Sequence, residues 1–133
     1  MNILLDTHIM LWCLYEPSKL SMDARNIISD PDNWICYSSI SLWECELKHF
    51  KHPDVFEITA ADLRADCLRA GYTQVDLHTR HIFSLHTIVT PEGIDHKDPF
   101  DKMLMSQART DHMLFLTHDS KIASYGIPYI KYV

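Results

Sequence analysis

Three aspartates lie within seven positions of the segment DHKDPFDKMLMSQA, which covers residues 95–108. Asp98 and Asp101 stand on either side of Pro99 and Phe100, and apolar residues at helical spacing follow them. Proline favours the first turn of a helix, so the two aspartates fall where a helix begins, on one face of it. Carboxylates in that place can cap the helix or bind a cation. The segment therefore predicts a helix start and a metal site together.

Other acidic residues fall at the ends of predicted strands. Asp6 directly follows the first apolar run of strand length, and Asp119 directly follows the fourth. Glu44 stands three residues after Ser41, which is the spacing of a capping box, in the helix expected after the second run. Each acid alone is explained as a helix cap. Together they would meet where the carboxyl ends of parallel strands converge, and their repulsion would raise pKa values and favour Mg²⁺ or Mn²⁺.

Alternating strands and helices must position these acids. Short apolar runs predict strands at residues 2–5, 34–37, 73–77, 113–117 and 128–131. Apolar residues at helical spacing predict helices at residues 7–15, 18–29, 41–50, 59–70, 78–88, 99–110 and 120–124. Strands that alternate with helices pair in parallel and bury both faces of their sheet. The predicted fold class is therefore α/β, a three-layer α/β/α sandwich with a central, mostly parallel sheet of four to five strands.

Composition and charge narrow the class of protein. The chain has 133 residues, of which 47% are hydrophobic and 3 are glycine, and we expect a single domain over residues 1–133. Four cysteines without a C-x-x-C pair are typical of reduced thiols. The absence of a basic leader and of a run of about 20 apolar residues predicts a cytoplasmic protein without membrane contact. The net charge of -6 argues against broad binding to nucleic acid, but a divalent cation could bridge to phosphate.

Four segments together resemble a known family. They are LLDTHIMLW at residues 4–12, SSISLWECELK at 38–48, HKDPFDKMLMSQA at 96–108 and LTHD at 116–119. In this order and spacing they are similar to the blocks of PIN-domain ribonucleases, specifically the VapC-like toxins of bacterial toxin–antitoxin systems. The resemblance covers nearly the whole chain and implies a PIN-like fold.

The resemblance implies a metal-dependent endoribonuclease that hydrolyses RNA phosphodiester bonds. Its catalytic and metal-binding carboxylates would be Asp6, Glu44, Asp101 and Asp119. Asp98 is expected to be an auxiliary metal ligand or only a helix cap. The carboxylates would hold one or two Mg²⁺, with Mn²⁺ as a substitute, and make a bound water nucleophilic. The products would carry a 5′-phosphate and a 3′-hydroxyl.

Three further side chains have auxiliary roles in this interpretation. The hydroxyls of Thr7 and Thr117 would orient carboxylates or water. Lys48 stands four residues after Glu44, so it either contacts phosphate or forms a surface ion pair with Glu44. We favour the ion pair.

The resemblance also implies partners. RNA would be the substrate, and an amphipathic segment of a cognate antitoxin protein would occupy a groove on the surface. Trp12 and Tyr15 lie in the first predicted helix and are candidates for the seam of a homodimer.

Other classes of protein explain the acids less well. A catalytically inactive PIN-like binding or regulatory module has no physical reason to keep mutually repelling carboxylates together. A phosphatase of the haloacid dehalogenase type needs a second aspartate after the first strand, where this chain has Asp6, Thr7 and His8. Two pairs of histidines have a zinc-like spacing, His49 with His52 and His78 with His81. No matching Cys/His pair completes a tetrahedral zinc site.

Overall fold

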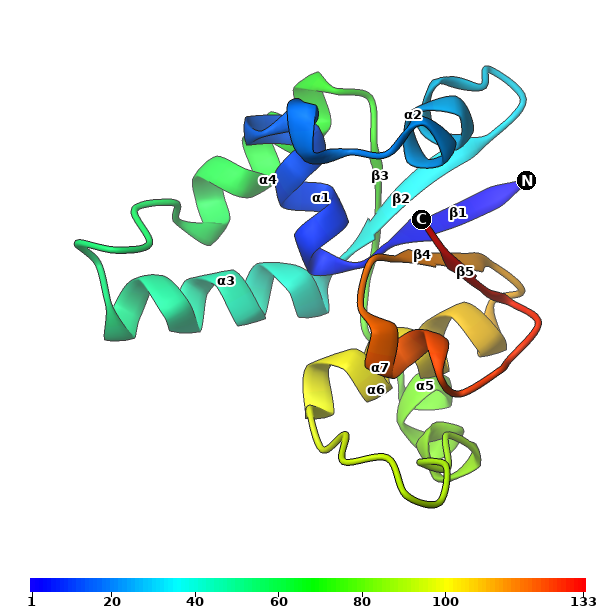
Figure 1. Cartoon of the computed structure of the whole chain (residues 1–133). Coiled ribbons are helices and arrows are strands. Elements are labelled where there is room, and N and C mark those ends of the chain that lie inside the picture. The colour runs from blue at the N-terminus through cyan, green and yellow to red at the C-terminus, as the bar shows by residue number, and fades with distance from the viewer.

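A five-stranded parallel sheet forms the centre of the computed structural model, which describes residues 1–133 (Figure 1). Its strands are β1 (Asn2–Leu5), β2 (Trp34–Ser38), β3 (Thr73–Val75), β4 (Leu114–Thr117) and β5 (Ile130–Tyr132). They lie in the order β3-β2-β1-β4-β5, and every neighbouring pair is parallel. The predicted fold class is confirmed, with all the strands parallel.

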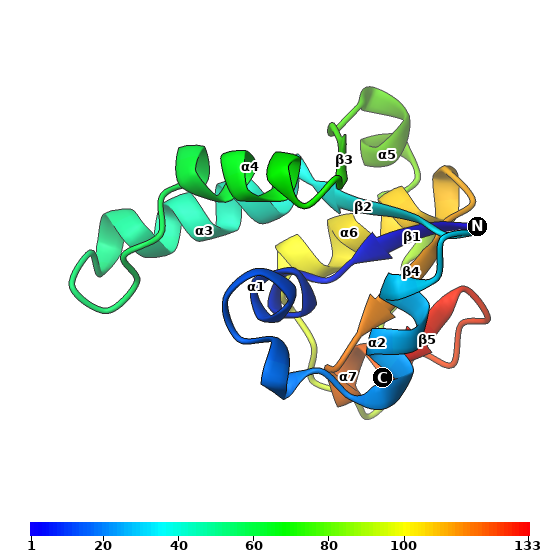
Figure 2. The same cartoon turned by 90° about the horizontal axis from the view of Figure 1, so that it is seen from above.

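Helices cover both faces of this sheet (Figures 1 and 2). They are α1 (Thr7–Tyr15), α2 (Met22–Ser29), α3 (Ser39–Lys51), α4 (Ala60–Arg69), α5 (Thr79–Phe83), α6 (Pro99–Thr110) and α7 (Ser120–Ala123), with short 3₁₀ helices at Pro17–Lys19 and Leu85–Thr87. Side chains of α1, α2 and α4 pack on one face, and side chains of α6 and α7 pack on the other. None of the helices is long and apolar enough to cross a membrane.

The central strand β1 is buried on both faces and leads directly to the first acid. Ile3 and Leu5 belong to the apolar cluster beneath α1, α2 and α4, whereas Leu4 belongs to the cluster beneath α6 and α7. This alternation is the two-residue period of a strand, and burial on both sides requires an apolar residue at each buried position. After the exposed Asn2 at the start of the strand, the next polar side chain is Asp6, which comes where the chain leaves the sheet.

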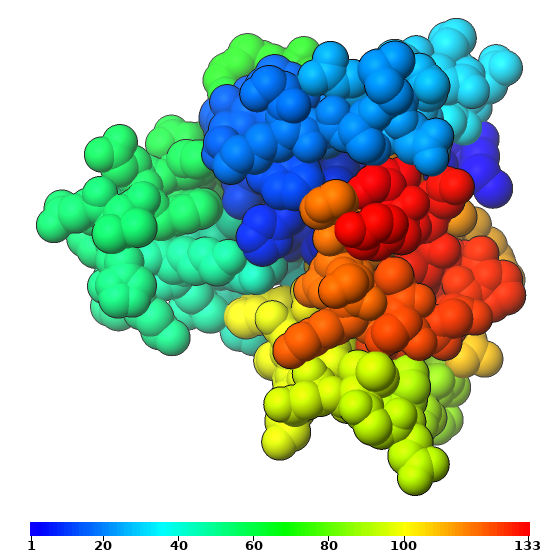
Figure 3. All heavy atoms as spheres, in the orientation of Figure 1, coloured from blue at the N-terminus to red at the C-terminus, as the bar shows by residue number.

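Helices α3 and α4 form an arm that extends beyond the sheet (Figures 1 and 2). The Cys45 side chain of α3 is fully buried in the apolar core. Oε2 of Glu46 accepts a hydrogen bond from the main-chain N–H of Ala60 at 2.8 Å, which ties the start of α4 to α3. Figure 3 shows the surface hollowed where the arm meets the blue amino-terminal and orange carboxyl-terminal segments. The arm thus forms one wall of a crevice.

Two predicted helices are interrupted in the structure. Residues 18–29 were expected to form one helix, but α2 begins only at Met22, because the Ser21 hydroxyl caps it by accepting from the main-chain N–H of Ala24 at 3.1 Å. The predicted helix at residues 78–88 divides into α5 and a 3₁₀ turn. There the main-chain N–H and the hydroxyl of Thr87 both donate to the Ser84 carbonyl, at 3.0 and 2.6 Å, which replaces the next helical bond.

The last strand also differs from the prediction of residues 128–131. The main-chain N–H of Ile130 bonds to the carbonyl of Ile127 at 3.0 Å, so a turn occupies the expected start of the strand. β5 therefore begins at Ile130, opposite Phe115 of β4. Pro128 has no N–H for a ladder, which agrees with its place in the turn.

Candidate active site

Two of the predicted acids lie at the carboxyl ends of adjacent strands. Asp6 follows β1 and caps α1 by accepting from the main-chain N–H of Thr7 at 2.7 Å. Asp119 follows β4 and caps α7 by accepting from the main-chain N–H of Lys121 at 2.8 Å. The Thr117 hydroxyl joins them, because it donates to Oδ2 of Asp6 at 2.7 Å and accepts from the main-chain N–H of Asp119 at 3.0 Å. Both acids are helix caps whose orientation is fixed.

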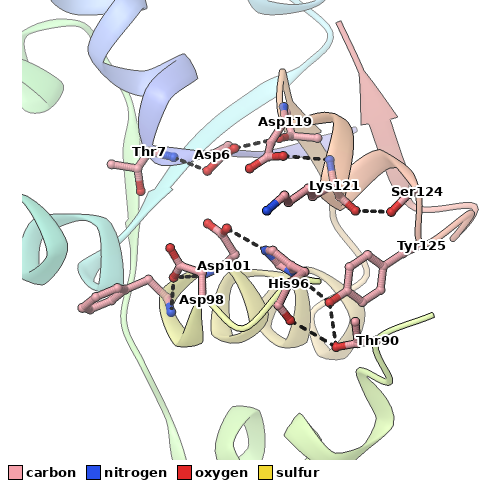
Figure 4. Close-up of polar contacts among 12 residues, drawn as sticks. Asp6, Thr7, Thr90, His96, Asp98, Asp101, Asp119, Lys121, Ser124 and Tyr125 are labelled. Atoms are coloured by element: carbon pink, nitrogen blue, oxygen red, sulfur yellow. Dashed lines mark hydrogen bonds and ion pairs between the residues drawn. The ribbon is translucent and has the colours of Figure 1, made fainter. Parts of the chain in front are cut away.

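The two aspartates at the start of α6 make different contacts. Oδ1 of Asp98 accepts from the main-chain N–H groups of Phe100 and Asp101, at 2.9 and 3.2 Å, so Asp98 is the helix cap. The Asp101 carboxylate instead points away from its own helix toward the other acids, with Oδ2 2.9 Å from Nε2 of His96 (Figure 4). Capping by Asp98 thus leaves Asp101 available to the crevice.

Glu44 is not part of a capping box, and that prediction is wrong. The helix begins at Ser39, two residues before Ser41, because the Ser38 hydroxyl at the end of β2 accepts from the main-chain N–H of Ile40 at 3.0 Å. Ser41 points inward and its hydroxyl lies 2.8 Å from that of Thr7. Oε1 of Glu44 is buried without a hydrogen-bond partner. An unpaired buried carboxylate oxygen is unfavourable unless a donor or cation reaches it.

Burial and like charges raise the pKa values of Asp6 and Asp101. Burial raises the pKa of Asp6, and the charge of Glu44 adds to it, although hydrogen bonds from Thr117 and Thr7 oppose the shift. Burial, together with the charges of Asp6 and Asp98, raises the pKa of Asp101 to about 7, against the hydrogen bond from His96. The carboxylates therefore lie within electrostatic reach of one another, in an environment that disfavours their charged forms.

Asp6 and Asp119 also line a common cavity of about 320 Å³, together with His8, Trp12, His118 and Ser120. No three His, Cys, Asp or Glu side chains lie close enough together to ligate one ion directly. Asp6 and Asp119 line this open cavity, and the predicted acids do not close around a single point. Such an arrangement leaves room for water or a substrate group between them.

The remaining predicted residues lie around the same crevice. Nζ of Lys48 lies 3.6 Å from Oε2 of Glu44, which is the ion pair favoured from the sequence. The Thr7 hydroxyl contacts Ser41 and does not contact a carboxylate, whereas the Thr117 hydroxyl does. Figure 4 shows the amine of Lys121 directed into the space between Asp101 and Asp119, a feature that the sequence did not reveal.

The structure adds partners on the far side of His96. Nδ1 of His96 lies 2.7 Å from the Tyr125 hydroxyl, which in turn lies 3.2 Å from Oγ1 of Thr90. Tyr125 is 29 residues away from His96 in the sequence and lies in an irregular segment, so neither periodicity nor a motif could have linked them. The one available signal was the position of His96 two residues before the first aspartate of the D-P-F-D block.

A parallel α/β sandwich with carboxylates at the ends of its central strands defines the class of this protein. The family model described as the PIN domain matches residues 3–128. The chain therefore belongs to the PIN-domain family. At a coarse level this membership supports a nuclease, which is a hydrolase.

Solved structures with the same fold come from toxin–antitoxin systems. The structure of VapBC2 from Rickettsia felis bound to a DNA fragment from their promoter matches with a TM-score of 0.68 and 18% identity, over 100% of this chain and 98% of that one. A toxin–antitoxin complex from Klebsiella pneumoniae matches with a TM-score of 0.60 and 16% identity, over 97% and 95%. The structure of VapBC-1 from nontypeable Haemophilus influenzae matches with a TM-score of 0.60 and 16% identity, over 94% of this chain and 92% of that one. At these identities the likeness shows the fold alone, and no curated protein matches the chain.

Proposed function

We propose that the protein is a metal-dependent endoribonuclease and the toxin of a toxin–antitoxin pair. The observation that carries this proposal is that Asp6 lies within electrostatic reach of both Glu44 and Asp101, and that Asp6 and Asp101 have raised pKa values. Asp98 and Asp119 border the crevice as helix caps. Repelling carboxylates at one end of a sheet are unfavourable for folding alone, and a cation would relieve that repulsion.

The side chains suit a hydrated divalent cation. Oε1 of Glu44 is buried without a partner, and the charge of Glu44 acts on the carboxylate of Asp6. Mg²⁺ is commonly held by one or two carboxylates, several waters and substrate phosphates, and not by a closed protein cage. Asp6, Glu44, Asp101 and Asp119 would hold Mg²⁺ or Mn²⁺, with Asp98 as auxiliary ligand or cap. When bound, the ion would make a water nucleophilic and neutralise charge on the phosphate.

The chain itself supplies orientation and charge. Hydrogen bonds from Thr7 and Thr117 fix both oxygens of Asp6, so this carboxylate needs no rearrangement to act. The amine of Lys121 points into the crevice and would donate to a phosphate oxygen of RNA, which offsets the acidic surroundings. Lys48 stays paired with Glu44. Hydrolysis would leave a 5′-phosphate and a 3′-hydroxyl.

The partners and location belong to the same proposal. The structural neighbours from three bacteria are toxin–antitoxin complexes, which supports a cognate antitoxin here. The arm and the loop after α3 expose the apolar side chains of Phe50, Val55 and Leu68, and exposed apolar side chains of this kind suit contact with an amphipathic segment. We propose a cytoplasmic protein and a homodimer. Tyr15, a candidate for its seam, is engaged by Asp66 within the chain.

The test is cleavage of total bacterial RNA by purified, partner-free protein on a denaturing gel, with Mg²⁺, Mn²⁺ or chelator. The variants are Asp6→Asn and Asp101→Asn, and the matched control is Asp95→Asn, an exposed aspartate of the same segment. Discrete fragments that require metal, persist in the control and vanish in both crevice variants are expected. Intact RNA under every metal condition, from protein shown to be folded, would overturn the proposal in favour of a binding module.

A further inference from the structure

His96 is held between α6 and the segment that follows α7. It lies in the loop before α6 and is 5% exposed. Its Nε2 lies 2.9 Å from Oδ2 of Asp101, and its Nδ1 lies 2.7 Å from the hydroxyl of Tyr125 (Figure 4). The two rings also pack edge to face, with centroids 5.4 Å apart at 86°. Both nitrogens of this buried ring are therefore paired, each with a different element of the fold.

The hydrogen bonds determine which ring nitrogen carries the proton. An ionised Asp101 can only accept, so Nε2 of His96 must donate to it. In the neutral ring Nδ1 then accepts, and the Tyr125 hydroxyl is the donor beside it. Oγ1 of Thr90 lies 3.2 Å from that hydroxyl and 3.4 Å from the main-chain oxygen of His96, so it restrains the tyrosine. Tyr125 and Thr90 thus favour the tautomer with its proton on Nε2.

We propose that His96 is a positioning residue for Asp101: its Nε2–H engages Oδ2 and leaves Oδ1 as the single oxygen offered to the crevice. This inference rests on the proposed metal-binding role of Asp101. A carboxylate with one oxygen engaged presents its other oxygen in one orientation. Hydrogen-bond partners of metal-binding side chains typically contribute about tenfold to a hundredfold in metal affinity.

Tyr125→Phe removes the hydroxyl that fixes the tautomer and keeps the aromatic ring. Its matched control is Tyr129→Phe, because the Tyr129 hydroxyl is buried without a hydrogen-bond partner and both rings pack on the same apolar cluster. The measurement is Mn²⁺ binding to the metal-free full chain by isothermal titration calorimetry. We expect Tyr125→Phe to weaken binding about tenfold and Tyr129→Phe to leave it unchanged.

Two substitutions of His96 separate positioning from packing. His96→Gln keeps an N–H donor on a side chain of similar reach, whereas His96→Leu fills the space without a donor. We expect the glutamine variant to retain most of the Mn²⁺ affinity and the leucine variant to lose about tenfold to a hundredfold. Equal losses in the two variants, with both shown to be folded by thermal unfolding, would contradict positioning by a hydrogen bond.

The tautomer itself is visible without metal. Long-range ¹H–¹⁵N spectra of the metal-free protein at about pH 9, where Asp101 is ionised, should show His96 protonated on Nε2 in the wild type and in Tyr129→Phe, and a mixture of tautomers in Tyr125→Phe. A wild-type ring protonated on Nδ1, or unchanged Mn²⁺ affinity in Tyr125→Phe, would overturn the positioning role and leave the proposed function standing. Wild-type protein that binds no Mn²⁺ would overturn both.

Discussion

Helix α6 has an aspartate–histidine pair at each end, and the same two atoms are in contact at the same distance in both pairs. At the amino end, Oδ2 of Asp101 lies 2.9 Å from Nε2 of His96, and at the carboxyl end, Oδ2 of Asp111 lies 2.9 Å from Nε2 of His81. Both imidazoles are buried. What differs is the third group: Arg80 donates to Asp111 from Nε at 3.0 Å and from its guanidinium NH₂ at 3.3 Å, whereas other carboxylates surround Asp101.

The group beside each pair determines whether the pKa of the aspartate is raised or lowered. Burial acts to raise the pKa of Asp111, but hydrogen bonds from Arg80 and His81 outweigh it, so the pKa is lowered. Burial raises the pKa of Asp101 to about 7, and the charges of Asp6 and Asp98 add to the shift. One pair therefore stabilises the fold at neutral pH, and the other opposes it. The end of α6 that destabilises the fold is the end that faces the crevice.

The largest expected difference between the two ends is in catalysis. Asp101→Asn should lower RNA cleavage by about a hundredfold or more, because stabilisation of transition-state charge by a metal site amounts to several kcal/mol. Asp111→Asn should cleave at nearly the wild-type rate, since Asp111 lies at the far end of the helix. Initial rates on a defined RNA fragment, measured for both variants, check this. Similar losses in both variants would mean that cleavage depends on the integrity of α6 and not on the Asp101 carboxylate.

The second difference is in stability, with the opposite variant affected. Asp111→Asn should destabilise the protein by about 1–2 kcal/mol at pH 7, because it removes charge-assisted hydrogen bonds that solvent partly screens. A lowered pKa means that this stabilisation is present above the ordinary aspartate pKa and is lost as pH falls through the folded value. Urea unfolding at pH 7 and at pH 3 should show the difference shrink in acid. An unchanged midpoint at pH 7 would rule out this role for Asp111.

Asp101→Asn should instead stabilise the metal-free protein. Because the folded pKa is raised to about 7, the folded state binds more protons than the unfolded state between the ordinary aspartate pKa and 7, so wild-type stability falls as pH rises through that window. Asparagine mimics the neutral carboxyl and avoids the loss. We expect its melting temperature in chelator to exceed that of wild type by about 3 °C at pH 8 and by less at pH 5. A lower melting temperature at pH 8 would show that Asp101 stabilises the fold.

The smallest effect is expected at the surface of the crevice. Lys48→Ala removes an ion pair between residues four apart on α3, whose closest atoms are 3.6 Å apart. Pairs of this kind contribute about 0.3–0.5 kcal/mol. The free energy of unfolding measured in urea should therefore change by less than about 0.5 kcal/mol. A larger loss would mean that Lys48 relieves the charge of Glu44 as a buried partner does.

The parts of the site that depend on local signals could be predicted from the sequence. The helix predicted at residues 99–110 matches α6 at both ends, because Asp98 as cap and Pro99 in the first turn are both local. Asp6 and Asp119 are likewise caps after apolar strands, as expected. Short-range hydrogen bonds decide these features, and the residues that make them are adjacent in the sequence.

The parts that depend on distant contacts could not be predicted. Ser38 and Ser41 are both acceptable caps for α3, and the contact between Ser41 and Thr7, 34 residues away, determines that Ser41 is buried and Ser38 caps. The same is true of the pairing between His96 and Tyr125 across 29 residues. The opposite charge environments at the two ends of α6 also arise only when the chain folds.

The most direct test of this contrast is an NMR titration of ¹³C-labelled aspartate carboxyl groups in the metal-free protein, repeated with Mg²⁺. Asp101 should titrate near 7, well above Asp111, and Mg²⁺ should lower the pKa of Asp101 while that of Asp111 stays the same. The claim that repulsion among the carboxylates raises the pKa of Asp101, and that a divalent cation relieves it, would be contradicted by either of two results. One is that both carboxyl groups titrate in the usual range, and the other is that Mg²⁺ leaves the pKa of Asp101 unchanged.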